Sequence, residues 1–151
     1  MLVEVLAAVA VVAIGLSALM SAIPVAGVAV TEGAKLSTAT FLAGARLEEV
    51  RAAPWSAAPP VDRLGVSGAP LSPPQSGRTT TFADEAALPN PYAGYSRQVR
   101  ILDCGVPPGC GAVISERLRQ VTVTVAYRPV TASGLAALDK AVTVTTLVAQ
   151  R

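Results

Sequence analysis

The chain has 151 residues, the length of one ordinary domain, and carries a net charge of +2. Charged residues make up 15% of it, below the share of about 25% that is typical of soluble domains. Because histidine is absent, the sequence excludes Ser-His-Asp and Cys-His catalysis and histidine-ligated metal sites. The small net charge does not by itself predict a nucleic-acid partner. These exclusions favour a membrane-associated or secreted structural protein, and we expect neither an enzyme nor a metal site or cofactor.

The first thirty residues form one long apolar stretch. No charge occurs from Val5 to Thr31, and about 20 mostly apolar residues are enough for a helix to span a bilayer. Gly15 and Pro24 are the weak points of this helix, and we expect a kink or a melted turn between them, because proline removes a backbone donor. A cleaved secretory signal is the alternative, but such a signal begins with basic residues and has no acid near its start.

Glu4 is the one charged residue before Glu32. A carboxylate among lipid-facing residues is costly, so it marks a function and needs a partner. The chain opens with Met1-Leu2-Val3-Glu4-Val5-Leu6 and continues as a long helix of Ala, Val, Ile and Leu. This opening resembles the start of a mature type IV pilin or type II secretion pseudopilin.

The resemblance implies that a prepilin peptidase removes a short leader and that the new N-terminal residue is N-methylated. In that family a glutamate at the fifth place neutralises the N-terminal ammonium of a neighbouring subunit. Glu4 stands at the fourth place, so either one residue precedes Met1 in the mature chain or the mature end departs from the family's pattern. The implied role of Glu4 and Met1 is a charge pair between subunits, in line with the rule that a buried charge is tolerated when it is paired.

Beyond Pro24 the pattern stays helical but becomes amphipathic. Phe41 and Leu42 lie off the apolar stripe and are predicted to face neighbouring subunits. Pro54 ends the helix, which therefore runs from about residue 2 to residue 53 and is roughly 75 Å long. The stripe itself recurs at spacings of three and four and is expected to pack on a sheet; it consists of Leu36, Ala39, Ala43, Leu47 and Val50.

Two further stretches carry the resemblance. Residues 45–55 read Ala-Arg-Leu-Glu-Glu-Val-Arg-Ala-Ala-Pro-Trp and are similar to the end of the helix in PilV-type minor pilins and GspI-type pseudopilins. The Val- and Thr-rich segments near the C-terminus are similar to the tails of the same proteins. We interpret Trp55 as a packing residue at the corner where the helix ends.

The rest of the chain is predicted to be a loop followed by strands. Proline recurs between residues 54 and 78, which indicates a loop that is partly in polyproline form. Thr79 to Thr81 lead into a short strand. Three later segments alternate between apolar and polar residues, as strands do: 95–102, 118–127 and 142–148.

One helix followed by strands favours an α+β fold. The resemblance implies the pilin fold: a long N-terminal helix, kinked and with its first half protruding, packed on a small antiparallel sheet. We divide the chain into a hydrophobic membrane or filament-core helix, residues 1–30, and a globular head, residues 31–151. Cys104 and Cys110 flank Gly-Val-Pro-Pro-Gly, and an even cysteine count in an exported protein predicts a disulfide, with free thiols as the alternative.

The leading functional interpretation is a structural subunit of a type IV pilus-like filament. Such a subunit rests in the bacterial inner membrane before assembly and lies in an extracellular filament afterwards. A minor pseudopilin of a type II secretion system, in a periplasmic pseudopilus, is the close alternative. The expected partners are copies of the chain or other pilins, the prepilin peptidase, and the pilus or secretion assembly machinery.

A DNA-uptake or adhesive pilin on a membrane anchor is the other alternative. It would require a basic face, for which we prefer the interpretation of a solvated sheet surface, because phosphate binding needs clustered charge. The candidate residues are Arg97, Arg100, Arg117, Arg119 and Arg128.

Overall fold

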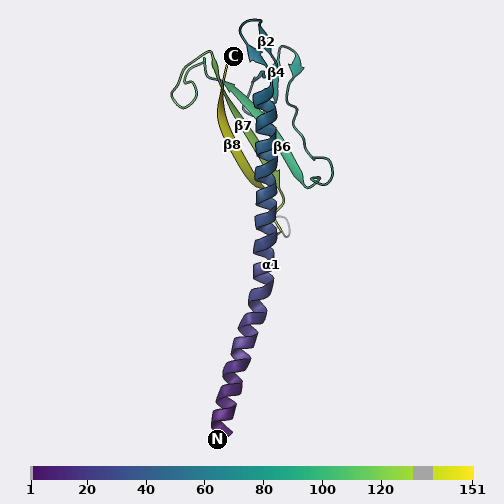
Figure 1. Ribbon diagram of the computed structural model, residues 1–151, viewed down its shortest axis with the longest axis vertical. Helices are drawn as coiled ribbons and strands as arrows, with labels where there is room; N and C mark the ends of the chain where they lie inside the picture. Colours follow the sequence, from purple (N-terminus) through teal and green to yellow (C-terminus); the bar gives the residue numbers. More distant parts are fainter. Residues whose placement is uncertain (1, 131–137) are drawn as a thin grey trace.

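The computed structural model describes residues 2–130 and 138–151. Its longest element is α1 (Leu2–Ala52), a single helix of 51 residues, which the strands β1 to β8 follow in the chain. The C-terminal half of α1 lies on the globular part of the molecule, the head, whereas its N-terminal half projects away from every other element (Figure 1). The fold is therefore α+β, as the order of one helix and several strands predicts.

The main sheet of the head has three antiparallel strands in the order β6–β7–β8. They are β6 (Tyr95–Asp103), β7 (Leu118–Tyr127) and β8 (Lys140–Ala149), so the structure confirms all three alternating segments. Every second side chain of β7 is buried, because successive side chains of a strand point to opposite faces. The buried set on β7 includes Val121, Val123, Val125 and Tyr127.

The C-terminal half of α1 packs across β7 and β8. Two residues depart from the expected stripe: Leu42 is buried in the core, and Leu36 is half exposed. Leu42 shares the covered face because it follows Ala39 by three residues and precedes Arg46 by four. The expectation that Leu42 faces a neighbouring subunit is therefore wrong, whereas Phe41 is exposed.

The helix runs without interruption through Gly15 and Pro24. Of the two expected alternatives, a kink or a melted turn, the continuous helix leaves only a kink. The axis of the N-terminal half leans away from the axis of the half that carries the head, which is a gentle bend in a continuous helix (Figure 1). A proline removes only one hydrogen bond from the helical ladder, and its neighbours Ile23 and Val25 keep helical geometry.

The proline-rich segment from residue 54 to 78 contains short strands as well as loop, which corrects the expectation of a loop throughout. The short strand expected at Thr79 is confirmed. Pro74 is the first residue of its strand, a position at which proline's missing N–H costs no ladder bond. The antiparallel pairs are β1 (Trp55–Ser56) with β2 (Val61–Asp62), and β4 (Pro74–Ser76) with both β3 (Val66–Ser67) and β5 (Thr79–Thr80).

The two edges of the main sheet differ. Residues from outside the main sheet bond to the outer edge of β6. The backbone of Glu85 exchanges two hydrogen bonds with the backbone of Arg97. The hydroxyl of Ser67 accepts another from the N–H of Ile101. The outer edge of β8 from Ala141 to Ala149 receives no backbone hydrogen bond from any other residue that the structure describes.

The division of α1 predicts that the head is separable from the protruding segment. A fragment from Thr31 to Arg151 retains the packed half of α1 and all three sheets. We expect it to be a soluble, folded monomer with mixed helix and sheet by circular dichroism, and the full chain to require detergent. A fragment that aggregates or polymerises as the full chain does would contradict this division.

Within that fragment, Leu64 tests the position of the core. Its side chain is fully buried, whereas Leu71 is 85% exposed. We expect Leu64→Ala to lower the free energy of unfolding by about 2–5 kcal/mol, because it leaves a cavity. The matched control Leu71→Ala should change it by no more than about 0.5 kcal/mol. Urea unfolding followed by circular dichroism measures both, and equal effects would show that the core is misassigned.

Candidate functional site

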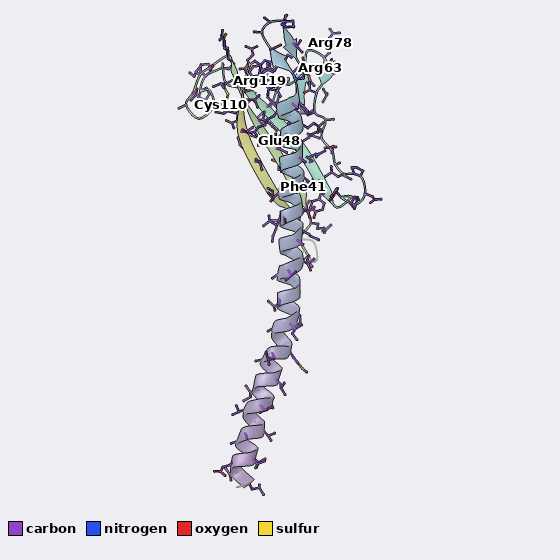
Figure 2. All side chains as sticks on the ribbon, viewed as in Figure 1. Phe41, Glu48, Arg63, Arg78, Cys110 and Arg119 are labelled. Carbon is purple, nitrogen blue, oxygen red and sulfur yellow. A yellow bond between two sulfur atoms is a disulfide. The ribbon has the colours of Figure 1, made fainter. Side chains whose placement is uncertain are left out.

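The protruding half of α1 is apolar and exposed on all sides. Every side chain described between Leu2 and Thr31 is exposed, and Figure 2 shows side chains projecting around this segment with no other element beside it. By length and composition α1 could cross a membrane: its most apolar 18-residue window has a mean hydropathy of 2.5, with no residue buried. So large an apolar surface marks a membrane or protein contact.

Glu4 lies in the first turn of α1. A negative charge at this end of a helix is favoured by the helix dipole. Met1, its implied partner on a neighbouring copy, lies outside the described residues. The structure therefore places the carboxylate near the end of the protruding segment that lies farthest from the head.

The first three charges of α1 after the apolar stretch face the sheet. Glu32, Lys35 and Arg46 share the covered face of the helix and bond to groups of the head. The opposite side, the outward face of α1, bears no charge from Val5 to Ala45. Over the head this face consists of exposed residues spaced by three or four: Val30, Ala34, Ser37, Phe41 and Ala45.

The outward face is unusual for a helix in water. A helix that packs one side on a core normally carries charged residues on its other side. Here Val30 and Phe41 are 73% and 63% exposed, and Figure 2 shows Phe41 on the part of α1 that carries the head. The outward face thus continues the surface of the protruding half along the head, as far as Glu48. Sequence reasoning missed it, although the helical spacing of Glu32, Lys35 and Arg46 would have revealed it.

Glu32 ties the helix to the end of the sheet. Its carboxylate accepts hydrogen bonds from the Lys140 ammonium at 2.7 Å, the Val130 N–H at 3.1 Å and the Tyr127 hydroxyl at 3.2 Å. The bonds from Lys140 and Val130 hold the pKa of Glu32 below its ordinary value, and the bond to Glu32 raises the pKa of Lys140. This Glu32 cluster marks the level at which α1 leaves the head.

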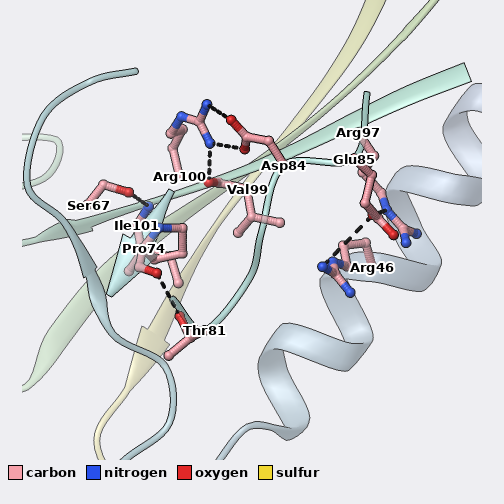
Figure 3. A network of polar contacts seen from close by, with 10 residues as sticks. All are labelled: Arg46, Ser67, Pro74, Thr81, Asp84, Glu85, Arg97, Val99, Arg100 and Ile101. Carbon is pink, nitrogen blue, oxygen red and sulfur yellow. Dashed lines mark hydrogen bonds and ion pairs between the residues drawn. The ribbon is translucent and has the colours of Figure 1, made fainter. Parts of the chain in front are cut away.

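A second cluster joins the middle of α1 to the loop before β6. The Arg97 guanidinium donates to Glu85 at 2.6 Å, and Arg46 approaches the same carboxylate at 3.9 Å (Figure 3). The bond from Arg97 lowers the pKa of Glu85. Arg46 also lies over the ring of Phe82, 5.2 Å from its centroid. These contacts give the loop its fixed place against the helix.

A third cluster lies at the far end of the head. Arg119 binds both carboxylate oxygens of Asp62, at 2.7 and 2.9 Å, and stacks on Trp55, 4.3 Å from the ring centroid. Burial raises the pKa of Asp62, but the hydrogen bonds from Arg119 and the N–H groups of Gly65 and Leu64 outweigh it, and the pKa is lowered. Trp55 is buried at the corner where α1 ends, which confirms its packing role.

The five arginines proposed for a basic face do not form one. Arg97 and Arg119 are bound to carboxylates, and Arg100 makes a bidentate pair with Asp84 at 2.6 and 2.8 Å (Figure 3). Arg117 and Arg128 flank opposite ends of β7. The structure thus corrects the hypothesis of a clustered basic surface, because three of the charges are neutralised locally.

The disulfide is formed between Cys104 and Cys110 in the connection from β6 to β7, as the sequence predicts. Gly109 in this loop has φ of +75°, and a Cβ there would lie 2.3 Å from the Val113 carbonyl oxygen. Only glycine fits this close approach. The disulfide therefore closes a tight, irregular loop at the end of the sheet away from the protruding helix.

Among residues 2–130 and 138–151, no group of three or more His, Cys, Asp and Glu side chains lies where it could hold a metal ion. The acidic residues with lowered pKa values form ion pairs with arginine or lysine. No family model, curated protein or solved structure matches the chain. The candidate site is therefore the surface of α1 itself: the protruding half with Glu4, and the outward face.

The ion pairs predict that acid destabilises the head. Glu32, Asp84 and Glu85 have lowered pKa values in the folded chain, so the unfolded chain binds more protons as the pH falls. Their contribution is complete above the carboxyl pKa of the unfolded chain, about 4, and is lost as the pH falls through the lower folded values. Urea unfolding of the Thr31–Arg151 fragment at pH 7 and pH 3 should show this loss. The loss should be smaller in Glu85→Gln, and equal stability at both pH values would contradict it.

Proposed function

We propose that the chain is a structural subunit of a type IV pilin-like filament, with the pilin fold and assembly through α1. The protruding half of α1 lies in the membrane before assembly and among the helices of other subunits afterwards. The head stays in water on the outside. A pilus and a secretion pseudopilus use the same arrangement, and the resemblance at both ends of the chain supports either.

The observation that carries this proposal is the uncharged outward face of α1. A plain membrane anchor needs apolar residues only where lipid surrounds it, up to about Thr31. Here Ala34, Phe41 and Ala45 continue that surface for a further 14 residues over the head, where the helix would otherwise face water. A second helix laid along this face would cover it. Packing between subunits explains the extension, and anchoring alone does not.

The protruding half also has the composition of a helix that packs closely on its neighbours. Small residues let helix backbones approach in apolar surroundings, where lipid offers no competing polar contact. Ala7, Ala8, Ala10, Ala13 and Gly15 are such residues. A cation from a neighbouring copy beside Glu4 would then fix the axial position of that copy, because a carboxylate in apolar surroundings favours a position beside an opposite charge.

Electron microscopy of the full chain tests the proposal. The chain is purified from membranes in detergent and the detergent is then removed. We expect helical filaments with α1 in the centre and the heads outside. A stable monomer in plain buffer, or filaments that also form from the Thr31–Arg151 fragment, would overturn the proposal.

Two substitutions should prevent assembly without harming the head. Glu4→Ala removes the counter-charge for a neighbouring copy, and Phe41→Glu places a charge on the outward face. Because both side chains are exposed, we expect unchanged membrane insertion and unchanged thermal unfolding, but loss of filaments by microscopy and sedimentation. Leu71→Glu, an equally drastic change at an exposed position of the head, is the control and should assemble normally. Normal filaments from Phe41→Glu would show that the outward face is not an interface.

A further inference from the structure

The head has a defined end that faces the protruding half of α1. There β7 ends and β8 begins, beside the point at which the helix leaves the sheet (Figure 1). The described surface at this end, the foot, combines two cationic and two apolar side chains, of which three are exposed. The foot consists of Lys35, Arg128, Val130 and Leu138.

The Glu32 cluster fixes the height of the foot along α1. Glu32 accepts a hydrogen bond from the N–H of Val130 and another from the ammonium of Lys140, two residues after Leu138. Lys35, one turn further along the helix, donates from Nζ to the carbonyl oxygen of Arg128 at 2.9 Å. The segment after β7 and the start of β8 both lead to the foot. Both are therefore held at the level of residues 32 to 35 of α1.

The length of the apolar segment brings this level to the surface of a bilayer. The uncharged run from Val5 to Thr31 has 27 residues, or about 40 Å at 1.5 Å per residue. A bilayer is about 30 Å thick in its hydrocarbon core and about 40–45 Å thick with its headgroups. With Glu4 at the outer edge of one headgroup layer, the outer edge of the other lies about 40–45 Å along the helix, at the level of about residues 31–34. The foot then meets the headgroups without any tilt of the head.

The chemistry of the foot suits that position. Leu138 is 84% exposed and Val130 is 41% exposed, and exposed apolar side chains gain from entering the headgroup boundary. The Arg128 side chain is exposed, and cations beside a membrane attract anionic lipid. The nearby carboxylates are Glu32, which Lys140 neutralises, and Asp139.

We propose that the foot rests on the membrane surface before assembly: Leu138 and Val130 enter the headgroup layer, and Arg128 and Lys35 bind the phosphates of anionic lipids. This inference relies on the membrane stage of the proposed function and adds a second contact to it. The contact holds the head upright on the membrane, with the outward face of α1 open to an approaching copy.

Quenching of tryptophan by brominated lipids tests the contact in the full chain. The variant Leu138→Trp is reconstituted into vesicles of phosphatidylcholine and phosphatidylglycerol, with or without brominated acyl chains. The native Trp55 is buried and lies about 30 Å along the helix from Lys35, so it serves as an unquenched background. We expect the added emission of Leu138→Trp to be lost in brominated vesicles.

Two further tryptophan variants serve as the positive and the negative control for this quenching. Val12→Trp lies inside the apolar segment, eight residues beyond Glu4, and should be quenched strongly. Leu71→Trp, which starts from an exposure of 85% against 84% for Leu138, should not be quenched. Quenching of Val12→Trp without quenching of Leu138→Trp would overturn the foot and leave the membrane helix intact. Absence of quenching in both would overturn the membrane stage of the proposed function.

The lipid charge gives an independent measure. Arg128→Glu, introduced together with Leu138→Trp, should reduce quenching in vesicles that contain phosphatidylglycerol and leave it unchanged in vesicles of phosphatidylcholine alone. Arg63→Glu is the control, because Arg63 is an exposed arginine beside β2 at the far end of the head. Equal effects of the two substitutions, or none from Arg128→Glu, would contradict phosphate binding by the foot.

Discussion

The structure depends on one constraint: a single helix must pack on a sheet with one side and present an uncharged surface on the other. α1 meets it by turning Glu32, Lys35 and Arg46 toward the head, where each finds a bonding partner. The outward face is left uncharged, and Phe41 stands exposed on it. Because the same helix positions the core, the protruding half and the outward face, a change in its rotation would disturb all three together.

The polar clusters fix the rotation of α1 about its own axis. The Glu32 cluster holds the helix where it leaves the head, and Arg46 holds it midway through Glu85. The pair of Arg119 with Asp62 fastens the segment that follows the helix. Each pair lies at the margin of the apolar core, where the carboxylates are partly exposed and keep part of their hydration. Together, the contacts of Glu32 and Arg46 hold α1 against the head at two levels along its axis.

Patterns with a short period were predictable from the sequence, and contacts between distant residues were not. The alternation in β7 predicts its buried valines, and the even cysteine count predicts the bond between Cys104 and Cys110. Arg119 and Asp62 are 57 residues apart, and no local pattern joins them. The prediction for Leu42 was wrong because the width of the covered face of α1 depends on how the sheet crosses the helix. Tertiary packing decides that crossing. The composition of the proline-rich segment gave no sign of the short strands that it forms.

The unequal edges of the main sheet limit how such heads can associate through their backbones. The edge of β6 is occupied by Glu85 and Ser67, whereas β8 presents nine residues from Ala141 to Ala149 with an open edge. Endless growth of a sheet from identical chains needs two open edges on each chain, one to give and one to receive. Among the described residues the main sheet has one open edge, so strand pairing between heads through this sheet stops after one partner. However closely such heads crowd together, this sheet therefore does not extend into an amyloid-like one.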